Sequence, residues 1–148
     1  MASLTVTLTE AVTINSVARG STNTLTIASV EHTMERVVTC PASNTTTLLT
    51  FNSNVYGAAN ALDLEDTKYV RITNLDSSNT VEIAVVGAAT LYQVGLAAGH
   101  SHIIGPADNF MLAEADTSPS FGTMTDIASI QANPGGDNIK VEVFVAGA

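Results

Sequence analysis

The sequence predicts an all-β fold, an antiparallel, jelly-roll-like β-sandwich of about nine or ten short strands with little or no helix. Apolar and polar residues alternate over most of the chain, which is the period of a strand with one buried face. Turn-forming residues recur mostly at intervals of about 8–12 residues, as they do in sandwiches. Threonine and valine, whose branched side chains favour strands, are frequent, and only 13% of residues are charged, too few for long salt-bridged surface helices.

The first strand is predicted close to the N-terminus, where leucine and valine alternate with threonine over residues 4–8. The apolar phase continues over residues 12–14 after a kink, and a turn is expected at residues 19–21. Such a terminal strand either pairs within its own sheet or adds to the sheet of a neighbouring subunit. We therefore predict one β-sandwich domain over residues 1–148, with residues 1–15 as an arm that exchanges between subunits.

The clearest fold signal runs from Tyr69 to Val86. Two alternating apolar runs are separated there by an Asn-, Asp- and Ser-rich turn over residues 74–79. This arrangement is typical of an antiparallel hairpin, so we expect its two strands to pair with each other.

Further strands are predicted from the same alternation, each bounded by turn residues. The segment 29–36 fits either a strand or a short helical spacing. A strong turn is predicted at residues 133–137, which read Asn-Pro-Gly-Gly-Asp. The expected strands cover residues 24–27, 35–39, 46–51, 91–96, 100–104, 110–113, 127–132 and 139–145.

The charge balance excludes two classes of partner. The formal net charge is −9, from five Lys and Arg against fourteen Asp and Glu. Nucleic-acid binding needs a basic surface, and an acidic membrane surface would repel this chain, so we expect neither as a partner. The N-terminus has no basic segment followed by an apolar run, so no secretory signal is predicted, and no stretch approaches the ~20 apolar residues of a membrane span.

Histidine and cysteine offer little chemistry. His100 and His102 lie two apart, so on a strand they would share a face as two metal ligands do, and His32 or Asp108 would have to complete the set. The alternative is a pair of polar side chains on a solvent face. Cys40, the single cysteine, is expected to be a small apolar residue facing the core rather than a reactive thiol.

The carboxylates likewise give little indication of a catalytic or metal site. Asp63, Glu65 and Asp66 form an acidic cluster without the spacing of a Ca²⁺ loop, which favours a solvated loop. Asp116 and Asp126 lie near loop ends, but the aromatic side chains that line a glycosidase cleft are scarce and tryptophan is absent. We therefore assign no catalytic, cofactor-binding or metal-binding residue, expect no cofactor, and predict that the protein is not an enzyme.

The middle of the chain resembles small structural proteins of tailed-bacteriophage virions, of the capsid decoration or cement type. The residues that carry the resemblance are Lys68–Asp76, Asn79–Ile83 and Tyr92–Gly99, a strand, Asn-rich turn, strand, short insert and strand ending in a glycine turn. The resemblance implies a β-sandwich located on a capsid surface, made in the host cytoplasm, and it identifies no functional residues.

The resulting expectation is a homo-oligomeric virion subunit, with a trimer favoured, that stabilises the shell through contacts with itself and with the major capsid protein. Threonine-rich outer faces suit neutral contacts that salt does not screen. The alternatives are an adhesion or receptor-binding module of a tail or fibre and, with less support, a metal-binding enzyme built on His100 and His102.

Overall fold

The computed structural model describes residues 1–54, 60–114 and 118–148, and within these ranges it contains strands and no α-helix, which confirms the all-β class. It has 13 strands rather than about nine or ten, because the short β2, β3 and β7 count separately. The described ranges also hold no helix long and apolar enough to cross a membrane. In chain order the strands are β1 (Ala2–Thr9), β2 (Val12–Ile14), β3 (Val17–Arg19), β4 (Thr22–Val30), β5 (His32–Cys40), β6 (Thr46–Asn52), β7 (Leu62–Asp63), β8 (Thr67–Asn74), β9 (Val81–Gly87), β10 (Leu91–Leu96), β11 (Ser101–Ile104), β12 (Ile127–Asn133) and β13 (Ile139–Gly147).

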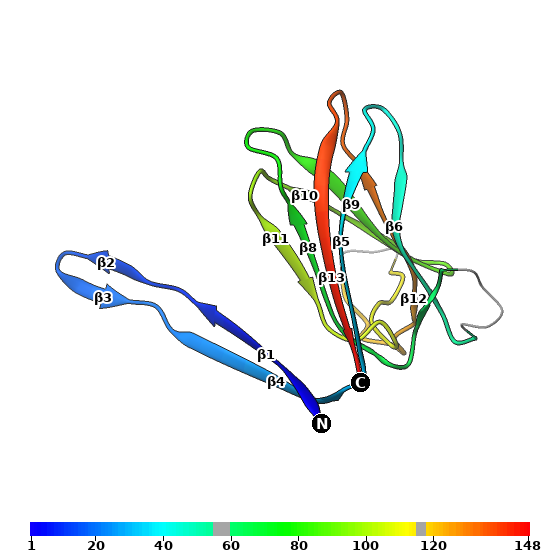
Figure 1. Cartoon of the computed structure of the whole chain (residues 1–148), viewed down its shortest axis with the longest axis horizontal. Helices are drawn as coiled ribbons and strands as arrows, with labels where there is room; N and C mark the ends of the chain where they lie inside the picture. Colours follow the sequence, from blue (N-terminus) through cyan, green and yellow to red (C-terminus); the bar gives the residue numbers. More distant parts are fainter. Residues whose placement is uncertain (55–59, 115–117) are drawn as a thin grey trace.

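Strands β5 to β13 form a body of two sheets packed face to face (Figure 1). One sheet has the order β11-β8-β13-β5 and the other β10-β9-β12-β6-β7. Apart from the two-residue β7, which runs parallel to β6, neighbouring strands are antiparallel. The chain switches repeatedly between the two sheets, and the resulting strand orders are those of a jelly roll, as predicted.

The core lies between the inner faces of these sheets. On β13 every second side chain is buried, and the register sets Val143 beside Ile72 and Val145 beside Val70. From the opposite sheet, Ile83 and Ile130 are fully buried in the same cluster. Burying a Val or Ile side chain contributes roughly 1.5–3 kcal/mol, so these branched residues stabilise the packing of the two sheets.

The predicted hairpin at Tyr69–Val86 is wrong. Strand β8 pairs with β11 and β13, whereas β9 pairs with β10 and β12 in the other sheet. Both strands alternate because each has one face in the shared core, and alternation alone does not tell a partner beside a strand from one across the sandwich. The chain therefore crosses from one sheet to the other after Asn74.

Asn74 holds this crossing together. Its side chain is fully buried and its amide donates hydrogen bonds to the carbonyl oxygens of Asn79 (2.8 Å) and Leu96 (2.9 Å). Its oxygen accepts the backbone N–H of Asp76 at 2.9 Å. The Asp76 carboxylate in turn accepts the backbone N–H groups of Asn79 and Ser78, and these bonds lower the pKa of Asp76. The predicted Asx turn is therefore present, but it joins two sheets.

Three smaller predictions can be compared directly with the backbone. The ambiguous segment 29–36 is extended, because β4 ends at Val30 and β5 begins at His32. The short strand predicted at 110–113 is reduced to an isolated bridge between Met111 and Thr125. The turn at 133–137 is present, with Gly135 in the left-handed region at φ 71°.

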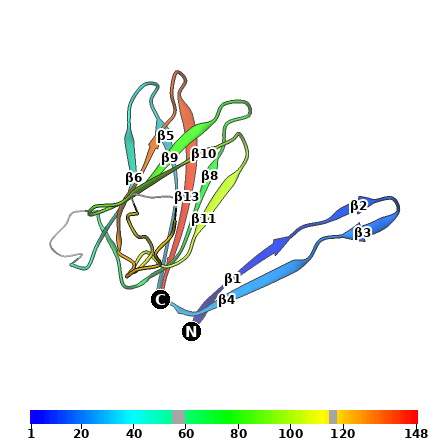
Figure 2. The ribbon, with the colours of Figure 1, turned by 180° about the vertical axis from the view of Figure 1, so that it is seen from behind.

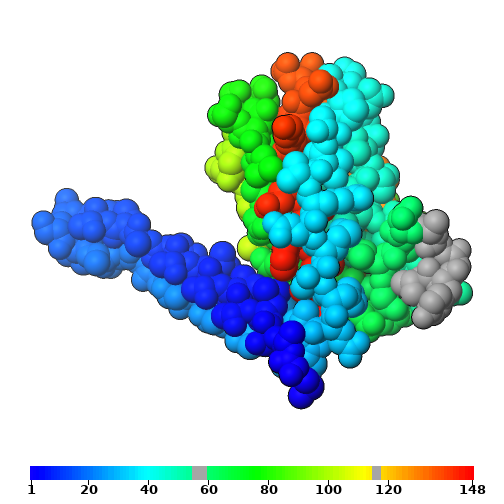
Figure 3. Space-filling model, viewed as in Figure 1, coloured from blue at the N-terminus to red at the C-terminus, as the bar shows by residue number. Residues whose placement is uncertain are grey.

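The first 30 residues lie outside the sandwich. Strand β1 pairs with β4 and β2 with β3, and the two hairpins run end to end away from the body (Figures 1 and 2). In the space-filling view they form a separate finger (Figure 3). We call Ala2–Val30 the arm. Residues 1–15, predicted as an arm, are its first half, and they pair with residues 17–30 of the same chain; their exchange between subunits stays a prediction.

Candidate functional site

The arm is a two-faced ribbon. Directly paired residues of an antiparallel hairpin lie on the same face, and here apolar residues pair with apolar ones: Leu4 with Ile27 and Val6 with Leu25. The alternate positions pair threonine with threonine along the opposite face. Leu25 is 53% exposed although it lies on the apolar face. The arm thus presents one apolar and one hydroxyl face.

The distal end of the arm continues the apolar face. Strands β2 and β3 are joined by Asn15 and Ser16, both at positive φ (51° and 64°), as a two-residue type I′ hairpin requires. Register places Val12, Ile14, Val17 and Arg19 on one face, and the three apolar side chains are 51%, 57% and 49% exposed. We call these four residues the arm tip.

A glycine sets the kink between the two hairpins. Gly20 has φ +116°, and a β-carbon there would lie 1.9 Å from the carbonyl oxygen of Glu10. The backbone N–H of Glu10 donates to the carbonyl of Ser21 at 2.9 Å across the same point. The predicted turn at 19–21 is thus a bend between β3 and β4, and it needs glycine for both conformation and space.

The arm lies close to the body at its root and along the inner part of its apolar face. The backbone N–H of Glu31 donates to the carbonyl of Gly147 at 3.0 Å. Farther out, Leu8 and Leu25 face Tyr69 and Ile103 across a largely apolar groove of about 210 Å³. The body surface beside the arm is therefore apolar, and the arm leaves this groove unfilled.

A second exposed apolar surface lies on the body. A hollow of about 340 Å³ is lined by Tyr92, Phe110, Met111, Phe121 and Met124, which we call the apolar shelf. The rings of Tyr92 and Phe110 are 6.5 Å apart, whereas Phe121 is 82% exposed and Met124 44%.

The rim of the shelf carries an acidic side chain. Glu114 also lines the hollow, and its Oε1 accepts the backbone N–H of Ser120 at 2.7 Å. Sequence analysis did not identify this surface, because Tyr92 comes from β10 and the other residues are spaced irregularly over residues 110–124.

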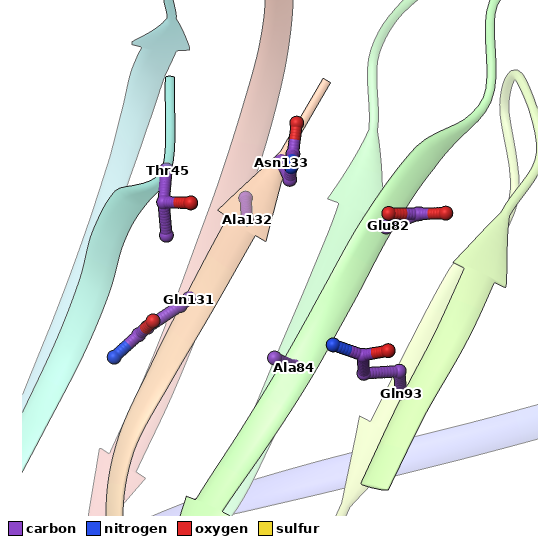
Figure 4. A pocket seen from close by; sticks show the side chains of 7 residues that line it. All are labelled: Thr45, Glu82, Ala84, Gln93, Gln131, Ala132 and Asn133. Carbon is purple, nitrogen blue, oxygen red and sulfur yellow. The ribbon is translucent and has the colours of Figure 1, made fainter. Parts of the chain in front are cut away.

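A third hollow is polar. Figure 4 shows Glu82, Gln93, Gln131 and Asn133 on the outer face of the sheet formed by β9, β10 and β12, around a space of about 110 Å³. Amide and carboxylate groups bind hydroxyls. None of the residues lining this space is aromatic, so it lacks the stacking platform that sugar rings favour.

The histidines are placed apart from one another. His102 on β11 is half-buried, and its Nε2 lies 3.0 Å from the hydroxyl of Tyr92 on β10, so the pair links the edges of the two sheets. Burial lowers the pKa of His102. His100 is exposed in the preceding turn, and the ring of His32 covers Gly147 at the edge of the body. No group of three His, Cys, Asp or Glu side chains able to hold a metal occurs in the described part of the chain.

The carboxylates serve turns where they are described. Asp63 accepts the backbone N–H groups of Glu65 and Asp66 at 3.1 and 3.3 Å, which closes a turn rather than a cation site. Asp126 accepts the backbone N–H of Asn109 at 2.9 Å. Asp108, proposed as a histidine partner, lies 3.5 Å from the side chain of Asn109. Asp116 lies outside the described residues.

Cys40 is fully buried in the core at the end of β5, as predicted. Burial raises the pKa of its thiol, while a hydrogen bond with Thr46 acts in the opposite direction. The thiol is therefore protonated and enclosed, which is the opposite of what a nucleophile needs.

No family description matches the sequence and no curated protein matches it. Among solved structures, a chain described as "Bacillus endospore appendages form a novel family of disulfide-linked pili" is similar with a TM-score of 0.44 and 8% identity, over 79% of this chain and 87% of that one. Likeness at this level carries no conclusion about function.

Proposed function

We propose that this protein is a structural subunit that acts by contact with other subunits, with the arm as its linking element. The carrying observation is that the arm projects from the body and that five apolar side chains along it remain about half exposed: Leu8, Val12, Ile14, Val17 and Leu25. A two-stranded hairpin is marginally stable alone in water, so an arm of this length gains stability when a partner covers these side chains.

The specific form that we propose is a capsid decoration protein of a tailed-phage virion. The resemblance of residues 68–99 to such proteins supports it, and so does the jelly-roll body, a fold used in viral capsid domains but also in lectins. The net charge of −9 agrees with a position outside a DNA-filled head. The partners in this proposal are further copies of the chain and the major capsid protein.

Sedimentation of the full chain tests the proposal. We expect a homo-oligomer, a trimer being favoured, and Ile14→Asp should weaken association at least tenfold because it puts a charge on the apolar face. Thr13→Asp is the matched control: it adds the same charge to the opposite face of the same strand and should leave association unchanged. A wild-type chain that is monomeric at micromolar concentration and fails to bind capsids stripped of it would overturn the proposal.

A second candidate, an adhesion module of a tail or fibre, has one observation in its favour, the polar hollow between β9, β10 and β12 (Figure 4). A glycan array would support it if wild-type protein gave selective signals that Gln93→Ala abolished. Because Gln93 lies on the body and not on the arm, the same variant should assemble normally, which separates the two functions.

A further inference from the structure

We propose that the arm tip of one copy docks on the apolar shelf of a second copy of this chain. This inference rests on the proposed function and names the surface that receives the arm. It starts from two separate exposed apolar surfaces on one chain. The tip offers Val12, Ile14 and Val17, and the shelf offers Phe121 and Met124 beside the Tyr92–Phe110 pair.

The tip is free of the body in the single chain. In both views of the ribbon the β2–β3 hairpin projects outward, while the segment around residues 110–114 lies within the body (Figures 1 and 2). A tip that stands clear of its own body is placed to reach the shelf of a neighbour. The four remaining exposed large apolar side chains of the body in the described ranges lie outside the shelf, at Val37, Leu75, Leu91 and Ile103.

The arm tip and the apolar shelf match in size and in chemistry. The hollow of about 340 Å³ lies at the lower end of the range of small binding pockets, ~300–1,000 Å³, and suits a few branched aliphatic side chains. Its walls include Met111 and Met124, whose unbranched side chains adapt to irregular partners. The tip ends in the tight Asn15-Ser16 turn, so a narrow apolar edge enters first.

The arm tip and the apolar shelf also carry charges of opposite sign. Arg19 is the one Lys or Arg in residues 1–30, and it pairs with Val12 on the apolar face of the tip. Glu114 lines the hollow on the shelf. Copies with a net charge of −9 repel one another, and a local pair of opposite charges fixes where they can approach.

The backbone of the shelf gives a further indication. Phe121 has φ +49°, a left-handed conformation that is unfavourable for a bulky residue, and it holds an aromatic ring in water. Such local cost is typical of functional positions, where a partner compensates for it. A contact that buries this ring provides that compensation.

Tip and shelf are different surfaces, so the contact is head-to-tail. Repeated head-to-tail contacts either close into a ring or continue as an open chain. A ring of three would satisfy every tip and every shelf in the trimer expected above. The contact also gives a strict test. A chain with a damaged tip and a chain with a damaged shelf must still associate with each other, through the intact shelf of the first and the intact tip of the second.

The experiment uses Ile14→Asp, which damages the tip, and Phe121→Ser, which damages the shelf. Each variant alone should be monomeric by sedimentation while its circular dichroism spectrum matches the wild type. Mixed in equal amounts they should form a heterodimer and nothing larger, because the intact tip of Phe121→Ser chains meets the intact shelf of Ile14→Asp chains. Leu75→Ser, which removes an exposed leucine outside the shelf, is the control for Phe121→Ser and should assemble normally.

The outcomes separate the two proposals. If Phe121→Ser assembles like the wild type while Ile14→Asp does not, the arm links subunits but the shelf does not receive it, and only this inference fails. If the two monomeric variants remain monomeric when mixed, the head-to-tail contact is wrong. If both single variants assemble like the wild type, the arm plays no part and the proposed function fails with the inference.

A charge exchange gives an independent check. Arg19→Glu should weaken association roughly tenfold, since it sets like charges against each other at the contact. Adding Glu114→Lys to the same chain should recover most of that loss, because every tip then meets a shelf of opposite sign. A double variant as weak as, or weaker than, Arg19→Glu would contradict the pairing.

Discussion

The arm and the body are built from the same local pattern and differ in what covers it. In both, Val, Ile and Leu recur at every second position, alternating mostly with Thr in the arm and with other, mainly polar, residues in the body. On β8, Val70 and Ile72 are fully buried because the opposite sheet covers them, whereas Leu25 on β4 is 53% exposed. The alternation therefore specifies a strand with one apolar face, but not whether its own chain supplies the second layer. Where no second layer exists, the face is available to another molecule.

The largest expected effect is on the free energy of unfolding, and it should differ between the body and the arm. Ile130→Ala removes a fully buried side chain from the body and should lower the free energy of unfolding by about 2–5 kcal/mol. Ile14→Ala in the arm tip should change it by less than about 0.5 kcal/mol, because that side chain is 57% exposed. Urea unfolding of the monomer measures both, and equal losses would mean that the arm unfolds as part of the body.

The second largest effect should come from removing the buried side-chain amide of Asn74, where the chain crosses between the two sheets. Asn74→Ala takes away the donors to the Asn79 and Leu96 carbonyls, and unsatisfied buried groups cost about 1–3 kcal/mol each. We expect a loss of about 2–4 kcal/mol in thermal or urea unfolding. The matched arm variant is Asn23→Ala, whose amide bonds only the exposed Ser21 hydroxyl and which should be almost neutral. A neutral Asn74→Ala would show that other contacts hold the sheets at this end.

A change at the kink should affect the arm alone. Gly20→Ala forces a β-carbon against the Glu10 carbonyl and should unfold or reorient the tip, with a change in the unfolding free energy of the body below about 0.5 kcal/mol. Hydrogen exchange should accelerate in β2 and β3 and stay unchanged in β8 and β13. Gly136→Ala is the control, because nothing lies within 4 Å of its added carbon and its φ is not positive. If exchange in β2 and β3 slowed, or if β8 and β13 lost protection, the arm would not be independent of the body.

The smallest expected effect is on pH dependence. Burial lowers the pKa of His102 in the folded state, so the unfolded chain binds the proton more readily. Stability should therefore fall as the pH drops through the ordinary histidine value of about 6.5, by less than about 1 kcal/mol because solvent screens the half-buried ring. His102→Gln should remove this dependence and His100→Gln should not. Stability that rises on acidification through this range would have the wrong sign.

The sequence correctly predicted the features that depend on residues adjacent in the chain, such as the positions of strands. Alternation at residues 69–73 and 81–86 correctly predicted two strands. Their pairing was wrong because the choice of partner depends on residues far along the chain, such as Val143, which lies beside Ile72. The tip hairpin was missed because its turn, Asn15-Ser16 between Ile14 and Val17, contains no glycine, the residue that usually marks a two-residue hairpin turn. Phe121 and Met124 have no periodic signal, so only three-dimensional structure places them beside Tyr92 and Phe110.

The root of the arm has a mechanical consequence. Ser29 lies at φ +57°, and past it one backbone hydrogen bond within the described residues, from Glu31 to Gly147, connects the root of the arm with the two-sheet body. A joint held by so few bonds bends more easily than either element it connects. In an assembly linked through these ribbons, differences in surface curvature would be absorbed at each joint, so one rigid building block could tile shells of unequal radius without repacking its interior.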